Sequence, residues 1–354
     1  MDYEVEVIPG LEEPAERELR AKLDDGLAVL GRPREGRIAI RYRGEPRRVN
    51  LLRSAIAVYR VERFDARRPT ALLGHENFDR VVRLLRGVIA MNPPGRYTTL
   101  RLSAAGAESP TFVRLKEQLA RETGLSSASD AGNASIIVRR SPTGAPGWEV
   151  LVRTSPRPLS ARSWRVCDLP GALNASVAYV MDELAGPAPE KRFLNVLCGS
   201  GTLLVERLGI CPAQRVIGVD RSELALACAR ENALASGHAP QITLLHADAT
   251  CLPLGRASVD TVVADLPYGL LVGSHRENAE LYPAVVQEAA RVAVPGASFV
   301  AITARRRLFE AALDRSRADW RCTRVLSLKI PFRSGYLTPA IYVLRRQGGG
   351  TIVP

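Results

Sequence analysis

Three short stretches of this 354-residue chain combine glycines and acids in a way that suits a nucleoside ligand. A strand expected at 193–197 runs into Gly199 and Gly201, where the chain can turn sharply and a ligand can approach the backbone. The next expected strand ends in Asp220, 19 residues after Gly201, and a carboxylate there can hold ribose hydroxyls. A third strand ends shortly before Asp248, whose carboxylate could meet an adenine amino group.

The glycine pattern distinguishes between two adenosine cofactors. A dinucleotide fingerprint has a third glycine that lets helix and strand pack tightly around a pyrophosphate, but counting on from Gly199 that position is Leu204. The pattern therefore favours S-adenosylmethionine over NAD. The alternative is that the glycines form only a tight strand-to-helix turn. Asp220 and Asp248, at successive strand ends, favour the ligand site.

A fourth expected strand, at 261–264, is followed by Asp265-Leu266-Pro267-Tyr268-Gly269, which could activate a base amine. The lone pair of an exocyclic amine is delocalised into the ring, so its N–H groups need acceptors before the nitrogen can attack a sulfonium methyl. The Asp265 carboxylate is one acceptor, and the Leu266 carbonyl, aimed by Pro267, is the second. Tyr268 offers a ring face for stacking the base. In isolation the five residues would suit a surface turn, but their place at a strand end favours catalysis.

The second half of the chain predicts the sheet that would position these groups. Nearly continuous apolar strands alternate with helices, which indicates a parallel sheet covered on both faces. The final two strands are close enough in sequence to form an antiparallel edge pair. The expected strands are 193–197, 215–219, 241–245, 261–264, 298–303, 322–328 and 340–345, and the expected helices are 202–208, 223–236 and 278–294. We predict an α/β, Rossmann-like fold.

The first half reads as α+β. Strand and helix patterns alternate up to residue 64, with strands at 3–7, 37–43 and 58–64 and helices at 11–23 and 49–57. A second module of roughly 90 residues follows. Its expected elements are helices at 78–89 and 111–122, a strand at 97–102, and a hairpin with strands at 134–138 and 148–153.

Composition points to a polyanionic partner. The net charge is +12, and residues 51–170 carry 19 basic and 10 acidic side chains. This charge favours nucleic acid. The chain lacks an apolar run long enough for a membrane span and lacks signal-peptide blocks, so we expect a cytoplasmic protein. Its six cysteines have no metal-ligand spacing, and we expect reduced, mostly buried thiols and no metal site.

The chain resembles the THUMP-domain class I RNA methyltransferases, which form N2-methylguanosine in tRNA. Asn195 to Thr202 is similar to a family motif written D-P-x-C-G-S-G-T, and the loop at 265–269 is similar to the family's catalytic loop. Pro9-Gly10-Leu11-Glu12 and 158–162 match further family segments. Two positions differ from the family motifs: Asn195 stands where the family has an acid, and Leu266 stands where it has a proline. Because the Leu266 carbonyl is kept, we expect Leu266→Pro to be tolerated.

The resemblance implies a seven-stranded methyltransferase domain at 176–347, preceded by a ferredoxin-like domain at 1–64, a THUMP domain at 65–156 and a linker at 157–175. It implies methylation of guanine N2 in tRNA, with position 6 favoured over position 10, by a monomer. The catalytic residues would be those of the loop from Asp265 to Tyr268. The residues expected at the cofactor are Asn195, Cys198, Gly199, Ser200, Gly201, Thr202, Asp220, Arg221, Asp248, Ala249 and Asp265.

Three other functions stay open at this point: methylation of guanine N2 in rRNA, methylation of adenine N6 in DNA, and RNA binding without catalysis. Arginines of the THUMP-like part could grip an RNA backbone, and the run 305–307 could contact phosphates. We expect Glu206 to be a surface residue. The four arginines considered in the THUMP-like part are Arg139, Arg140, Arg153 and Arg157.

Overall fold

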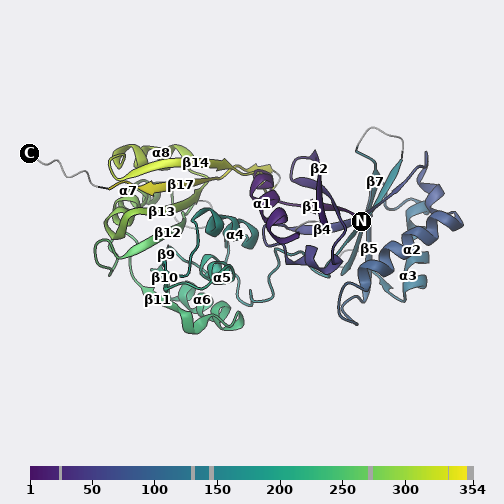
Figure 1. Cartoon of the computed structure of the whole chain (residues 1–354), viewed down its shortest axis with the longest axis horizontal. Helices are drawn as coiled ribbons and strands as arrows, with labels where there is room; N and C mark the ends of the chain where they lie inside the picture. Colours follow the sequence, from purple (N-terminus) through teal and green to yellow (C-terminus); the bar gives the residue numbers. More distant parts are fainter. Residues whose placement is uncertain (24–25, 129–131, 143–146, 270–273, 334, 349–354) are drawn as a thin grey trace, which may run out of the picture. The chain divides into compact units, whose positions relative to one another are not determined.

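The chain divides into two units, residues 1–161 and 162–354, each built around its own sheet. Figure 1 shows the computed structural model. It describes residues 1–23, 26–128, 132–142, 147–269, 274–333 and 335–348. None of the described helices is long and apolar enough to cross a membrane.

The first unit is one eight-stranded sheet with strand order β2-β3-β1-β4-β8-β7-β5-β6. Its strands are β1 (Asp2–Glu6), β2 (Leu27–Arg34), β3 (Arg37–Tyr42), β4 (Ala57–Phe64), β5 (Thr99–Ala104), β6 (Ser126–Ser127), β7 (Ala134–Arg140) and β8 (Trp148–Arg153). Its α-helices are α1 (Glu12–Leu23), α2 (His75–Ile89) and α3 (Pro110–Thr123). Strand β4 pairs antiparallel with β8, so the boundary expected at residue 64 lies within a continuous sheet. The division of this unit into two domains stays a prediction.

The prediction of a helix at 49–57 is wrong. A 3₁₀ helix covers Pro46–Leu51, and β4 already begins at Ala57. The buried Glu18 side chain accepts hydrogen bonds from the backbone N–H groups of Arg53 and Ser54, each at 2.8 Å. Those donors are therefore satisfied without a helix. Strand β2, which pairs antiparallel with β3, was not predicted.

The second unit confirms the α/β prediction. Its seven-stranded sheet has the order β11-β10-β9-β12-β13-β17-β14, in which β17 runs opposite to the other six strands and pairs antiparallel with β13 and β14. The strands are β9 (Arg192–Val196), β10 (Arg215–Asp220), β11 (Ile242–His246), β12 (Val259–Asp265), β13 (Ala293–Thr303), β14 (Trp320–Ser327) and β17 (Ala340–Arg346). A separate hairpin consists of β15 (Ile330–Phe332) and β16 (Gly335–Leu337).

Helices cover both faces of this sheet. Figure 1 shows α4, α5 and α6 on one face and α7 and α8 on the other. Their bounds are α4 (Ala175–Leu184), α5 (Thr202–Leu208), α6 (Glu223–Ala235), α7 (His275–Val292) and α8 (Arg306–Arg315). Buried aromatic rings hold α8 against the sheet, with Phe309 and Tyr342 edge to face at 4.9 Å between centroids.

Candidate active site

The loop after β9 turns back on itself through residues with positive φ. Gly199 has φ +52° and Gly201 has φ +77°. A Cβ on Gly201 would lie 3.1 Å from the Cβ of Ala229, so glycine there lets α5 approach α6 closely. A Cβ on Gly199 would meet no described atom within 4 Å. Open space therefore borders the backbone of Gly199, as approach by a cofactor requires.

Asp220, at the end of β10, is joined directly to this loop. Its Oδ2 accepts a hydrogen bond from the Gly199 N–H at 2.9 Å, and its Oδ1 accepts from the Ser222 N–H at 3.0 Å. Each carboxylate oxygen has a second lone pair, so the ribose contact expected of Asp220 remains available. The structure thus brings together two residues that the sequence assigned to one site.

Asp248 lies just beyond the neighbouring strand β11. The Ala247 N–H donates to the Asp220 carbonyl at 3.2 Å, which joins the two strand ends. The exposed Asp248 carboxylate accepts from the backbone N–H of Thr250 at 2.8 Å and from its hydroxyl at 2.7 Å, and these bonds lower the Asp248 pKa. Arg221 is exposed beside it and Ala249 is buried.

Besides Ala249, five of the expected cofactor residues are buried: Asn195, Cys198, Ser200, Gly201 and Thr202. The Asn195 Nδ2 donates to the Val263 carbonyl at 3.2 Å, whereas its Oδ1 accepts no hydrogen bond from the described residues. Burial raises the pKa of the Cys198 thiol, which makes it a poor nucleophile. The position of the missing third glycine, Leu204, packs against Gly218, where an added Cβ would lie only 2.5 Å from the leucine side chain. Because Gly218 on β10 has no side chain, it leaves the space that the Leu204 side chain occupies.

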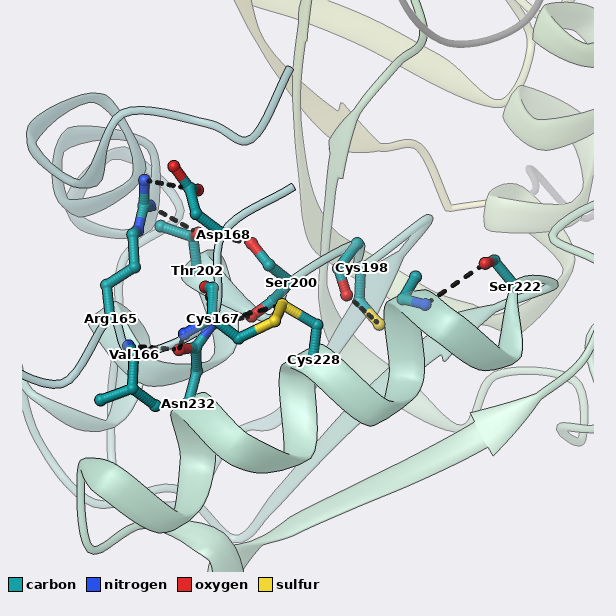
Figure 2. The surroundings of a disulfide bond; sticks show 12 residues. Arg165, Val166, Cys167, Asp168, Cys198, Ser200, Thr202, Ser222, Cys228 and Asn232 are labelled. Carbon is teal, nitrogen blue, oxygen red and sulfur yellow. Dashed lines mark hydrogen bonds and ion pairs between the residues drawn. A yellow bond between two sulfur atoms is a disulfide. The ribbon is translucent and has the colours of Figure 1, made fainter. Parts of the chain in front are cut away.

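Residues 165–167 of the expected linker are joined by hydrogen bonds to residues that follow β9, either directly or through Asn232 (Figure 2). The Asn232 Oδ1 accepts from the N–H groups of Val166 and Cys167 at 2.9 and 3.0 Å, and its Nδ2 donates to the Ser200 carbonyl at 2.9 Å. Arg165 donates to the Thr202 hydroxyl at 2.8 Å. This part of the expected linker therefore belongs to the second unit and is bonded to the segment around the glycine loop.

A disulfide joins Cys167 to Cys228 on α6, as Figure 2 shows. The expectation that all six cysteines are reduced is therefore wrong, because folding brings two Cα atoms that are 61 residues apart in sequence to within 5.4 Å. The expectation of mostly buried thiols is also wrong, since Cys251 and Cys322 are exposed.

Glu206 is fully buried on α5, contrary to the expectation of a surface position. Its Oε1 accepts from the Arg162 Nε at 2.9 Å, so the segment before α4 covers this helix and neutralises the buried carboxylate. Two arginines expected to face RNA also have structural roles. Arg139 forms an ion pair with Glu149 at 2.8 Å, and Arg153 donates to the Pro156 carbonyl at 2.7 Å.

The loop expected to be catalytic, residues 265–269, begins at the end of β12. The Leu266 N–H donates to the Ile302 carbonyl at 3.0 Å, and the Leu266 side chain is fully buried in the core. Proline has no N–H to donate and would leave a buried carbonyl without this partner. The expectation that Leu266→Pro is tolerated is therefore replaced by one of destabilisation. Gly269, with φ +73°, turns the chain away as expected.

Three side chains hold the backbone carbonyls of this loop. The Pro267 carbonyl accepts from Asn278 Nδ2 at 2.7 Å and from the Tyr282 hydroxyl at 2.8 Å. The Tyr268 carbonyl accepts from Arg305 Nε at 2.9 Å. Among the described residues none donates to the Leu266 carbonyl, so this buried oxygen has no protein partner there.

Asn278 and Tyr282 were not predicted as site residues, and Arg305 was considered as a phosphate contact. Both missed residues are buried and lie four positions apart on α7. The sequence feature that could have identified them is a polar residue within the apolar stripe of a helix. The helix pattern alone does not show that this stripe faces the end of β12.

The Asp265 carboxyl has an unusual environment for an acid. Burial raises its pKa to about 7, and a hydrogen bond with the Tyr268 hydroxyl partly opposes this shift. Burial and the Asp265 charge raise the pKa of Tyr268 well above its usual range. Tyr268 is therefore a neutral donor to Asp265, in addition to the base-stacking role expected from sequence.

The geometry defines a class I methyltransferase, and comparisons with known proteins agree. Residues 162–333 match the family model described as "RMKL-like, methyltransferase domain". The tRNA (guanine(6)-N2)-methyltransferase of Thermus thermophilus is 33% identical over 196 residues, covering 55% of this chain and 56% of that protein. The mouse tRNA (guanine(6)-N(2))-methyltransferase THUMP3 is 30% identical over 197 residues, covering 52% of this chain and 38% of that protein.

The solved structure of TrmN from Thermus thermophilus superposes over 98% of this chain and 99% of its own, with a TM-score of 0.73 and 26% identity. The second unit matches a methyltransferase family, and the chain as a whole is similar to the THUMP-associated class I RNA methyltransferases. The sequence matches span about half the length of the Thermus relative and less of the mouse relative.

Proposed function

We propose that this protein transfers a methyl group from S-adenosylmethionine to the exocyclic N2 of a guanosine in tRNA, at position 6 rather than position 10. The observation that carries the proposal is the pair of acceptors at the end of β12. The Asp265 carboxylate and the Leu266 carbonyl follow one another in a loop in which side chains of the protein hold the Pro267 and Tyr268 carbonyls. The names of the similar proteins support guanine N2 and tRNA position 6.

The residues at the glycine loop fit the cofactor. Open space borders Gly199, and Asp220 is fixed within hydrogen-bond distance of the loop with lone pairs to spare. Asp220 would hold the ribose, Asp248 would meet the adenine amino group, and Asn195 would offer its unpartnered Oδ1. The bound cofactor supplies an electrophilic methyl group on a sulfonium.

The loop residues would prepare the guanine amine. Asp265 and the Leu266 carbonyl accept its two N–H bonds, so the lone pair turns toward the methyl carbon. The cofactor would supply the methyl group that the amine accepts, and Asp265 would take the proton that the amine releases. A carboxylate with a pKa of about 7 suits this role because it is largely ionised at slightly basic pH and still basic enough to take a proton.

Exposed arginines of the first unit would bind the tRNA backbone. The candidates are arginines for which no ion pair is described in the part of the chain that the structure covers. They include Arg83, Arg96, Arg101 and Arg114, whose side chains are all exposed. We propose a cytoplasmic location, as expected from the sequence.

A purified enzyme and two tRNA transcripts test the proposal. One transcript carries guanosine at position 6 and the other carries inosine, which lacks the 2-amino group. We expect labelled methyl to enter only the guanosine transcript, and nucleoside mass spectrometry with mapping to place it at position 6. Equal incorporation into the inosine transcript would exclude N2 as the acceptor. Incorporation at guanine 10 would correct the position while keeping the chemistry.

A further inference from the structure

A short hairpin stands apart from the seven-stranded sheet. Strands β15 and β16 pair only with each other among the described residues, with Ile330 opposite Leu337 and Phe332 opposite Gly335. The Leu328 N–H donates to the Pro339 carbonyl at 2.8 Å and closes the base of the hairpin. The hairpin contributes no strand to the sheet, so its surface residues need another explanation.

Strand register places this hairpin at the edge of the sheet that carries the catalytic loop. Ser327, the last residue of β14, pairs with Ala340, and Ala340 pairs with Thr303 at the end of β13. In the adjacent strand pair, Asp265 lies opposite Ile302. The hairpin therefore leaves the sheet at the end where β12 delivers Asp265.

The hairpin presents the Tyr336 ring and the Arg333 guanidinium to solvent, whereas Lys329 and Phe332 are half-buried. Tyr336 is 63% exposed, and the Lys329 Nζ lies 4.8 Å from the centroid of its ring. The exposed Arg333 guanidinium lies 5.3 Å from the centroid of Phe332. Residues 328–339 contain these two basic residues and no acid. An exposed tyrosine contributes little to a core, whereas rings beside cations suit stacking on bases and pairing with phosphates.

We infer that this hairpin is an RNA-binding element of the catalytic unit, contacting the nucleotides next to the target base. The inference rests on the proposed function and deepens it by assigning where the substrate strand lies. A base extruded for methylation leaves its neighbours unstacked. Tyr336 would restore stacking to one of them, and Lys329 and Arg333 would meet the adjoining phosphates.

Methylation kinetics of the full-length protein test this assignment. We expect Tyr336→Ala to raise the KM for tRNA at least fivefold and Tyr336→Phe to keep it near the wild-type value, because the ring face is required. The double variant Lys329→Ala/Arg333→Ala should also raise KM and reduce the salt dependence of tRNA binding by about two counterions. The affinity for S-adenosylmethionine and the melting temperature should be unchanged in all three variants.

Arg321→Ala is the matched control. Arg321 is an exposed cation on β14, but it lies opposite Arg345 at the far end of that strand. Wild-type KM in the hairpin variants, or the same loss in Arg321→Ala, would overturn the inference. Unchanged tRNA binding with altered self-association would assign the surface to a protein partner and also overturn it.

The two proposals fail separately. If the wild-type protein does not methylate guanine N2, the proposed function is wrong, and the tRNA dissociation constants of the same variants still decide whether the hairpin binds RNA.

Discussion

The hydroxyl of Tyr282 donates a hydrogen bond to the backbone carbonyl of Pro267 over 2.8 Å. The same hydroxyl lies 2.7 Å from the Thr303 hydroxyl, and the Thr303 oxygen accepts from the Arg305 N–H at 2.9 Å. Because the phenol has a single proton, which goes to Pro267, Thr303 must donate to Tyr282. A directed chain of hydrogen bonds thus joins the end of β13 to the catalytic loop, and each bond polarises the next.

Loss of this bond should slow the chemistry. We expect Tyr282→Phe to lower kcat by about tenfold, equivalent to roughly 1.4 kcal/mol, because the loop carbonyls lose a fixed orientation. The affinity for S-adenosylmethionine should stay at the wild-type value. Tyr342→Phe is the control, since its buried ring also loses a hydroxyl hydrogen bond, to Glu310, away from the loop. An equal loss of kcat in both variants would indicate general destabilisation.

Activity should rise with pH through the pKa of Asp265, about 7, because only the ionised carboxylate can take the proton that the amine releases. Tyr268→Phe removes the hydrogen bond that lowers this pKa, so the rising limb should move to higher pH. Asp265→Asn should abolish methyl transfer while cofactor and tRNA still bind. Rate profiles from about pH 5.5 to about pH 9, a range that brackets this pKa, would check this. A Tyr268→Phe profile identical to the wild type would contradict it.

The raised pKa of Asp265 also predicts how the stability of the folded state depends on pH. The folded pKa of Asp265 is raised above its ordinary value of 3.8, so the folded state binds the proton more tightly. Its contribution to stability is fully present below the ordinary pKa and is lost as pH rises through about 7. We therefore expect Asp265→Asn to melt higher than the wild type at about pH 8 and to show a smaller difference at about pH 5. Calorimetric scans at both pH values would measure this.

Asp220 should dominate binding of the cofactor. Asp220→Ala removes the expected ribose acceptor and frees the Gly199 N–H, so the affinity for S-adenosylmethionine should fall at least tenfold, about 1.4 kcal/mol by calorimetry. Asp260→Ala is the control, because Asp260 pairs with Arg192 near the start of its strand, away from the glycine loop. Normal affinity in Asp220→Ala would remove Asp220 from the site.

The disulfide should stabilise the cofactor site. Cys167→Ser is expected to cost about 2–4 kcal/mol of unfolding free energy and to weaken S-adenosylmethionine binding, because Cys167 and Ser200 share Asn232 as a partner. The exposed free thiol Cys251 gives the control variant Cys251→Ser. Reductant should lower the melting temperature of the wild type and leave that of Cys167→Ser unchanged; an equal shift in both would exclude a stabilising disulfide.

Leu266→Pro should lose stability. The variant removes a hydrogen bond to Ile302 and a buried leucine side chain, so we expect a cost of about 2 kcal/mol or more. Leu266→Ile keeps the N–H and most of the buried volume and should stay close to the wild type. Denaturant unfolding of both variants measures the difference, and wild-type stability in Leu266→Pro would restore the expectation drawn from sequence.

The sequence alone determined the features that depend on neighbouring residues. Glycines that permit positive φ, acids at strand ends and the loop from Asp265 to Gly269 are local, and parallel strands place their carboxyl ends at one edge wherever the rest of the chain lies. The cofactor loop, the catalytic loop and the seven-stranded sheet were therefore predictable from residue types and periodicity.

Only the tertiary structure decided which distant side chains meet. Burial of Glu206 depends on Arg162, 44 residues earlier, and the bond between Cys167 and Cys228 spans 61 residues. Tyr282 reaches Pro267 only because α7 packs beneath the end of β12. Such residue pairs leave no local pattern in the sequence. They stabilise the fold by giving buried polar groups a partner, and this can happen only after the helices and strands have packed together.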